Sequence, residues 1–264
     1  MMYCNGCSYT YGIGTAEFEN VEDCLSYSWP NQLAKILKTE HINEAQPGSS
    51  NARIFRDSAL YLINNPDTEL AVTMWSDAPR IEIFRPQETE YDYQGMAQIT
   101  PQGVGQTKSY FHREALESYY AFVHSTQKAV IETLGYMIAL QNIADNLNIP
   151  LIQQHYKANI SHYLWDILGE YTKQEVWDKC GSVERAFYNT VVNMVDILKA
   201  HPHVAGVDWT EQDQEKYSTS MRSVCITRGK AKESSISLGH PYREAHVMYA
   251  EFLSNYIKDN NVLS

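Results

Sequence analysis

The sequence lacks any run of about 18 apolar residues and has no surplus of positive charge. Without such an apolar run, no membrane-spanning helix is expected. The 21 Lys+Arg stand against 32 Asp+Glu, which gives a formal net charge of -11. This acidic balance argues against nucleic acid or an anionic membrane surface as the main partner.

The N-terminus also lacks the basic region and the apolar region of a signal peptide. We therefore expect the chain to stay in the cytoplasm in which it is made. The five cysteines, an odd number, are then expected to be reduced thiols. No second Cys or His cluster accompanies them, so the sequence predicts neither a zinc site nor another metal or redox cofactor.

The 264 residues are 44% hydrophobic, which is enough to bury a large core. Short apolar runs predict strands at residues 1–5, 41–45, 69–75, 150–155 and 223–227. Helical spacing predicts helices at residues 29–37, 52–64, 113–147, 161–171, 182–200 and 241–257. We expect Ser182 to cap its helix, and Val247 to face the core from the last helix.

Alternation of strands and helices predicts an α/β fold with three layers, in which a parallel sheet lies between helices. We expect one domain over residues 1–264, with a loop and helical insertion at about 85–147. The polar stretch 85–108 is read as a loop, and the apolar surface of 113–147 is broad enough for a homo-oligomer contact. Parallel strands end at one edge of a sheet, and ligands bind at that edge.

Two short motifs near the ends of the chain resemble blocks of the SGNH/GDSL hydrolase family. The stretch 6–12, Gly-Cys-Ser-Tyr-Thr-Tyr-Gly, is similar to its nucleophile block, with Cys7 where the family usually has Asp. His240-Pro241, just before the last helix, resembles its histidine block, and Gly48 resembles its oxyanion glycine. The N-terminal variant looks particularly like SGNH-type proteins encoded by bacteriophages.

The resemblance implies a serine esterase of flavodoxin-like architecture that needs no cofactor. Ser8 is the expected nucleophile, and His240 the base that takes its proton. The backbone amides of Ser8 and Gly48 are expected to stabilise the oxyanion. The substrate class is an O-acyl ester of a carbohydrate or small molecule, for which Tyr9, Trp75 and Arg80 are the expected binding residues.

The sequence departs from the family pattern at two positions. The Asn of the third block is absent, because Ser76 stands there, so Ser76 or Asn51 is expected to complete the oxyanion hole. The position three residues before His240 is occupied by Ser237, which has no charge. Asp77 and Glu233 are the candidate replacements for the missing acid.

Other interpretations of the same residues stay open. The tyrosines are also typical of half-buried packing, and Arg80 of a structural ion pair. Cys4 and Cys7 form a C-x-x-C pair, but no other thioredoxin-like feature follows. A weakened or inactive SGNH-like protein that binds a ligand, as a phage accessory protein for example, is the competing function. Acyl transfer to an acceptor other than water would use the same residues.

Overall fold

A central sheet of four parallel strands organises the chain. The computed structural model describes residues 1–15, 21–84, 96–99, 110–156, 160, 163–164, 168–169, 171, 173–204, 221 and 240–263. The strand order is β2-β1-β3-β6. The strands are β1 (Met2–Asn5), β2 (His41–Asn43), β3 (Leu70–Trp75) and β6 (Leu151–His155). Four of the five predicted strands are thereby confirmed, and residues 223–227 lie outside the described residues.

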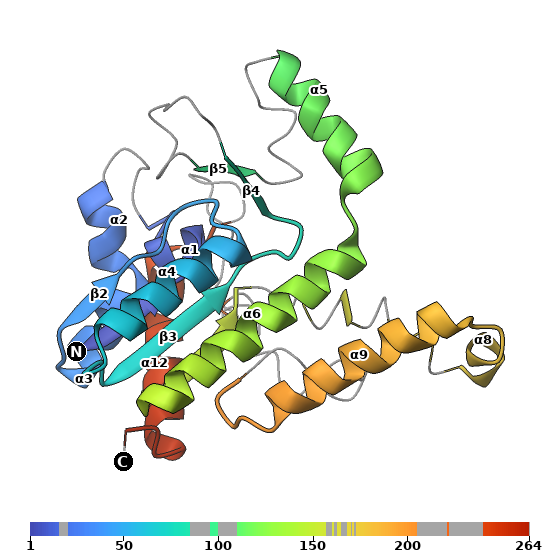
Figure 1. The fold of residues 1–264 in the computed structure, drawn as a ribbon. Coiled ribbons are helices and arrows are strands. Elements are labelled where there is room, and N and C mark those ends of the chain that lie inside the picture. The colour runs from blue at the N-terminus through green and yellow to red at the C-terminus, as the bar shows by residue number, and fades with distance from the viewer. Residues whose placement is uncertain are drawn as a thin grey trace.

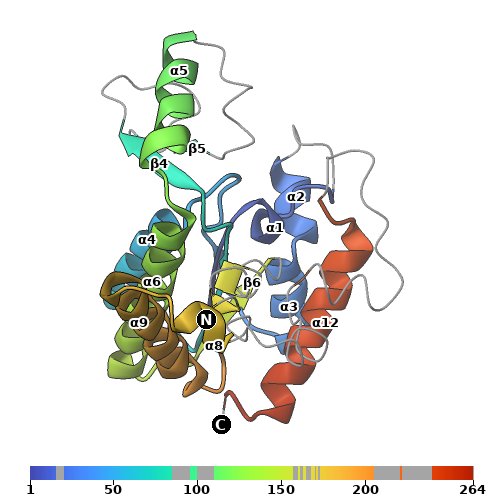
Figure 2. The same ribbon diagram turned by 90° about the vertical axis from the view of Figure 1, so that its right-hand side faces the viewer.

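Helices cover both faces of this sheet (Figures 1 and 2). One face carries α2 (Val21–Tyr27), α3 (Trp29–Leu37) and α12 (Arg243–Asp259). The other carries α4 (Asn51–Asn64), α6 (Thr126–Leu147) and α9 (Ser182–Lys199). The predicted three-layer α/β/α fold is confirmed.

The alternation of side chains along each strand explains the two layers of core. Successive strand residues point to opposite faces, so Tyr3 and Ala71 pack under α4 and α6. Their neighbours Met2, Cys4 and Val72 pack under α3 and α12. Because both faces are covered, the inner strands read as unbroken apolar runs, which is why they were recognisable.

The predicted helix over residues 113–147 is wrong as a single element. The chain forms α5 (Tyr110–Ser118), a π-helical turn η2 (Tyr119–Val123) and then α6. Ser125 restarts the helix, since its side chain accepts a hydrogen bond from the amide of Lys128. The expected apolar stripe breaks at the same place, where Val123 is 61% exposed.

Two smaller expectations about the later helices are also corrected. Ser182 is the first residue of α9 and not its N-cap. Gly181 holds the N-cap position, where it makes no side-chain hydrogen bond. Val247 on α12 is 39% exposed rather than inward. Of the predicted helix 161–171, only isolated residues are described.

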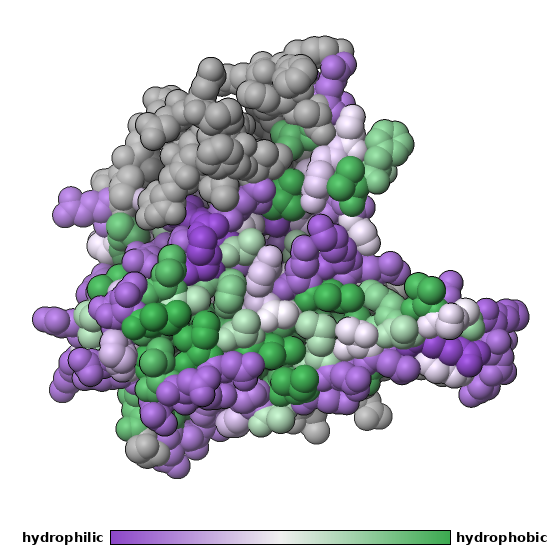
Figure 3. Space-filling model, viewed as in Figure 1, coloured by the Kyte–Doolittle hydropathy of each residue, from purple (hydrophilic) through white to green (hydrophobic). Residues whose placement is uncertain are grey.

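Beyond the carboxyl edge of the sheet stand α5 and a small antiparallel pair, β4 (Ile81–Phe84) and β5 (Met96–Ile99) (Figure 2). A short helix, α8 (Gln174–Trp177), precedes α9. The surface seen in Figure 3 mixes apolar and polar side chains over α4 and α6. No helix in the described part of the chain is long and apolar enough to cross a membrane.

Two fully buried histidines make the fold sensitive to acid. Burial lowers the pKa of His155 to about 3, and burial together with the nearby His240 lowers the pKa of His246 to about 3. The ordinary value is 6.5. Below pH 6.5 each imidazole takes up a proton in the unfolded chain but stays neutral in the folded protein until about pH 3. Stability is therefore full above pH 6.5 and falls as the pH is lowered through this window.

We expect each of these histidines to lower the free energy of unfolding by about 2 kcal/mol between pH 7 and pH 5. His155→Leu removes one titrating group, so the variant should lose about 2 kcal/mol less than wild type over this interval, measured by urea unfolding. Between pH 9 and pH 8, where both imidazoles are almost entirely neutral in both states, the stabilities of the two proteins should change equally. An identical loss in variant and wild type between pH 7 and pH 5 would contradict the assignment.

Candidate active site

Ser8 lies where the chain leaves β1 and turns into the short helix α1 (Ser8–Tyr11). The turn requires Gly6, because a Cβ there would lie 2.9 Å from the carbonyl oxygen of Met74. Gly12 ends the helix in the left-handed region at φ 101°, and its amide donates to the carbonyl of Ser8. Ser8 is thereby fixed at the carboxyl edge of the sheet.

His240 comes from the opposite end of the chain and meets Ser8. Its Nε2 lies 2.8 Å from the Ser8 Oγ. The serine hydroxyl donates across this distance when the imidazole is neutral with its proton on Nδ1. The ring of Tyr9 lies beside the imidazole, with 5.2 Å between ring centroids. The structure therefore brings together the two residues that the sequence predicts as nucleophile and base.

The segment after α1 positions His240. Gly14 adopts φ 93°, and a Cβ at this residue would lie 3.0 Å from the Cβ of His240 and 2.8 Å from the carbonyl oxygen of Pro241. Arg243, at the start of α12, donates from Nε to the carbonyl of Thr15 at 2.6 Å. These contacts hold the loop that carries His240 against the loop that follows Ser8.

Gly48 lies on the loop between β2 and α4, which runs beside the Ser8 turn. The amide of Gln46 donates to the carbonyl of Gly6 at 3.3 Å. Gly48 has φ 81°, a left-handed conformation that favours glycine. Among the described residues, no acceptor is found for the amide N–H of Ser8 or of Gly48. These two N–H groups are therefore candidate donors to a ligand.

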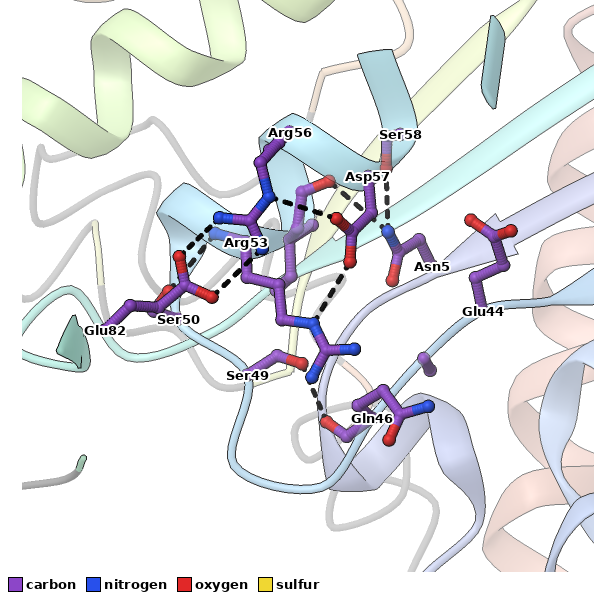
Figure 4. Close-up of polar contacts among 12 residues, drawn as sticks. Asn5, Glu44, Gln46, Ser49, Ser50, Arg53, Arg56, Asp57, Ser58 and Glu82 are labelled. Atoms are coloured by element: carbon purple, nitrogen blue, oxygen red, sulfur yellow. Dashed lines mark hydrogen bonds and ion pairs between the residues drawn. The ribbon is translucent and has the colours of Figure 1, made fainter. Parts of the chain in front are cut away.

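Polar contacts fasten α4, and with it the Gly48 loop, to the rest of the edge (Figure 4). Asn5 at the end of β1 donates from Nδ2 to Ser58 Oγ at 3.0 Å. Arg56 forms ion pairs with Asp57 at 3.3 Å and with Glu82 on β4 at 2.7 Å. The middle of α4 is thus tied to the strand that leads into Ser8.

Asn51 and Ser76, the two expected substitutes for the missing Asn, contact each other. The amide of Ser76 donates to Asn51 Oδ1 at 2.7 Å. Asn51 Nδ2 donates to the Ser76 carbonyl at 3.2 Å and to Thr133 Oγ1 at 3.0 Å, which uses both of its protons. Asn51 therefore holds the loop after β3 in place. The Ser76 hydroxyl is buried and has no partner in the described structure.

A polar cluster follows β3 and β6 at the same edge. The hydroxyl of Tyr156 donates to Asp77 at 2.7 Å. Arg80 lies over the Tyr156 ring, with its Cζ 5.6 Å from the centroid, and also contacts the thiol of Cys7. Burial raises the pKa of Tyr156, and the charge of Asp77 raises it further. The second candidate acid, Glu233, lies outside the described residues.

Two of the three expected binding residues have packing contacts. Trp75 is fully buried, and its indole donates to Gln153 at 2.9 Å. It therefore belongs to the core, and the expectation that it binds substrate is corrected. Tyr9 is 5% exposed and packs between His240 and Tyr156. Arg80 lines a cavity of about 570 Å³ beside the site, between α4, β4 and α6.

Sequence reasoning missed several residues of this edge. Tyr156 contacts Asp77, 79 positions away in the sequence, and Thr133 contacts Asn51, 82 positions away. No local sequence pattern shows such contacts. Gly14 carried a signal, since two glycines close after a nucleophile motif indicate a backbone with special conformation. Among the described residues, no group of three His, Cys, Asp or Glu is arranged to hold a metal ion.

Comparison with known proteins gave structural similarity without sequence similarity. No family model and no curated protein matches the chain. A protein described as lipolytic and of the G-D-S-L family, from Desulfitobacterium hafniense DCB-2, has a TM-score of 0.47 and 9% identity, covering 96% of this chain and 97% of that one.

Two acetyl xylan esterases are similar to the same extent. Est2A from Butyrivibrio proteoclasticus has a TM-score of 0.47 and 10% identity, covering 100% of this chain and 64% of its own. AlAXEase has a TM-score of 0.46 and 8% identity, covering 97% and 100%. At these identities and TM-scores, the similarities assign the chain neither to a family nor to an activity.

The position of His240 is expected to depend on Gly14. Gly14→Ala introduces a Cβ that collides with the His240–Pro241 backbone at a positive φ. We expect labelling of Ser8 by a fluorophosphonate probe to slow by about 100-fold, since small displacements of a base are costly, while the circular dichroism spectrum stays the same.

Gly135→Ala is the matched control. Its Cβ would meet only the end of the Met194 side chain, at an ordinary 3.7 Å, inside α6. This variant should label at the wild-type rate. Equal rates for Gly14→Ala and wild type would show that Gly14 does not position His240.

Proposed function

We propose that the chain is a serine ester hydrolase of the SGNH type, with Ser8 as nucleophile and His240 as general base. The observation that carries the proposal is the 2.8 Å contact between Ser8 Oγ and His240 Nε2, two residues 232 positions apart. A nucleophile within hydrogen-bond reach of a base, at the carboxyl edge of a parallel sheet, is the arrangement that acyl transfer needs.

In the proposed reaction, Ser8 Oγ attacks the acyl carbonyl carbon while its proton moves to His240 Nε2. The alcohol leaves as its C–O bond breaks and takes that proton from the imidazolium. Water then attacks the acyl-enzyme with His240 again as base, which releases the acid and restores the Ser8 hydroxyl. No cofactor enters this sequence.

The amides of Ser8 and Gly48 are the proposed donors to the oxyanion. The Ser76 hydroxyl, which has no partner among the described residues, is the proposed third donor. Asn51 supports this hole by fixing the Ser76 backbone. Asp77, which accepts a hydrogen bond from the Tyr156 hydroxyl at 2.7 Å, is the proposed acid near the site.

The proposed substrate is an O-acyl ester of a carbohydrate or small molecule with a short acyl group. Ser8 is only 6% exposed and Tyr9 5%, so little room is left on the Tyr9 side. A single domain with an insertion, a cytoplasmic location, a homo-oligomer and a phage-type variant are proposals that rest on the sequence alone.

A ligand-binding protein of the same fold without activity is the second candidate. Two observations favour it, namely Ser76 in the place of the Asn of the third block and Ser237 in the place of the acid. Both candidates use the same edge of the sheet, but only the hydrolase needs an activated Ser8.

Hydrolysis of 4-nitrophenyl acetate separates the two candidates. We expect turnover by wild type, and a loss of about 1000-fold or more in kcat in Ser8→Ala and in His240→Gln, because either change removes the nucleophile–base pair. Ser182→Ala, an exposed substitution at the start of α9, should retain the wild-type rate. If wild type neither turns over acyl esters nor reacts with a fluorophosphonate, the hydrolase proposal fails.

A further inference from the structure

Arg80 has no ion-pair partner among the described residues, and it lies beside Cys7, the residue directly before the proposed nucleophile. Its Nη1 is buried and has no hydrogen-bond acceptor in the described structure. No carboxylate of the described residues lies within ion-pair distance of it, whereas Arg53 and Arg56 on α4 both have such partners. A buried N–H group of a cation that lacks an acceptor is costly, so the position of Nη1 favours an anion.

The surroundings of Arg80 place this cation between Ser8 and a cavity. On one side its guanidinium contacts the thiol of Cys7, the residue directly before Ser8. On the other side Arg80 lines the cavity of about 570 Å³, together with Asn51, Tyr119 and Tyr136. Arg80 therefore contacts both the residue before Ser8 and the cavity.

The charges around the cavity make Arg80 the selective element. Among the described residues that line it, Arg80 is the one cation. Glu82 on the wall is neutralised by Arg56, which donates to both of its oxygens at 2.7 and 3.2 Å. Glu132, the other acidic lining residue, lies at the exposed rim with Lys128 at 3.5 Å. Since the whole chain carries a net charge of -11, long-range attraction does not draw anions here.

Asp77, the neighbouring acid, lies outside ion-pair distance of the Arg80 guanidinium. Asp77 is close enough to raise the pKa of Arg80, as are Cys7 and Tyr156, and together they outweigh the opposite effect of burial. Its Oδ2, however, accepts the Tyr156 hydroxyl at 2.7 Å. The Cζ of Arg80 lies over the Tyr156 ring at 5.6 Å from its centroid, and a guanidinium can bind a carboxylate through two parallel N–H groups.

We propose that Arg80 is a specificity-determining residue that binds a carboxylate carried by the ester substrate, so that the site prefers anionic esters to neutral ones. This inference rests on the proposed function for its placement of the reacting bond at Ser8. The binding preference itself is measurable without turnover.

The test uses the Ser8→Ala chain, which holds an ester without cleaving it. Isothermal titration calorimetry compares 4-acetoxybenzoate with its neutral methyl ester, and phenyl hydrogen succinate with its methyl ester. The first pair carries the charge on the alcohol side, and the second on the acyl side. We expect the anionic member of one pair to bind about 10-fold more tightly or better, as for a charge-assisted hydrogen bond.

Arg80→Gln in the same background should reduce that affinity ratio to about 1, and Arg80→Lys should keep part of it because only the planar fork is lost. The matched control is Arg185→Gln. Arg185 also stacks on an aromatic ring without a carboxylate partner among the described residues, with its Cζ 5.2 Å from the Trp177 centroid, but it lies on α9 away from this cavity. It should leave the ratio in place.

Equal binding of anionic and neutral esters in both pairs, or a preference that survives Arg80→Gln, overturns the inference. If Arg80→Gln in the chain with Ser8 intact lowers kcat equally for both members of a pair, Arg80 acts on the reacting centre and the specificity assignment is wrong. An Arg80-dependent preference in Ser8→Ala, together with no turnover by wild type, would sink the proposed hydrolase and keep the anion site.

Discussion

The docking of α12 against the first helices is the contact on which the candidate site depends. His246, fully buried on α12, accepts a hydrogen bond from the amide of Trp29 at 3.0 Å. The ring of Trp29 also meets that of Tyr249 edge to face, with centroids 5.7 Å apart. Because His240 lies just before α12, its ring reaches Ser8 only while this packing is intact.

This arrangement joins catalysis and folding in one constraint. The contact between Ser8 and His240 joins residues 232 positions apart, so local structure alone cannot form it. The contact forms only after the sheet and helices have assembled. The buried imidazole of His246 must also be neutral for the docking, since a charge without a partner in the core is costly. Acid therefore acts on the position of the base through the fold, besides any direct protonation of that base.

Much of the fold could be predicted because burial on both faces leaves clear marks in the sequence. β3 and α3 were placed almost to the residue, since one is an unbroken apolar run and the other starts with Pro30 in its first turn. The break at residues 124–125 was not predictable from periodicity, because the apolar spacing of α6 continues backwards through η2. There a local serine cap, together with an exposed surface, decided the outcome.

At the site, residues with a local motif were predicted and residues defined by distant contacts were not. Ser8 and His240 stand in short motifs that a single sequence displays. Asn51 was expected to face the oxyanion, but its two protons are used by a carbonyl after β3 and by Thr133 on α6. The type of a residue indicates which hydrogen bonds it can donate. The packing of α4, α6 and the loop after β3 decides which acceptors Asn51 contacts.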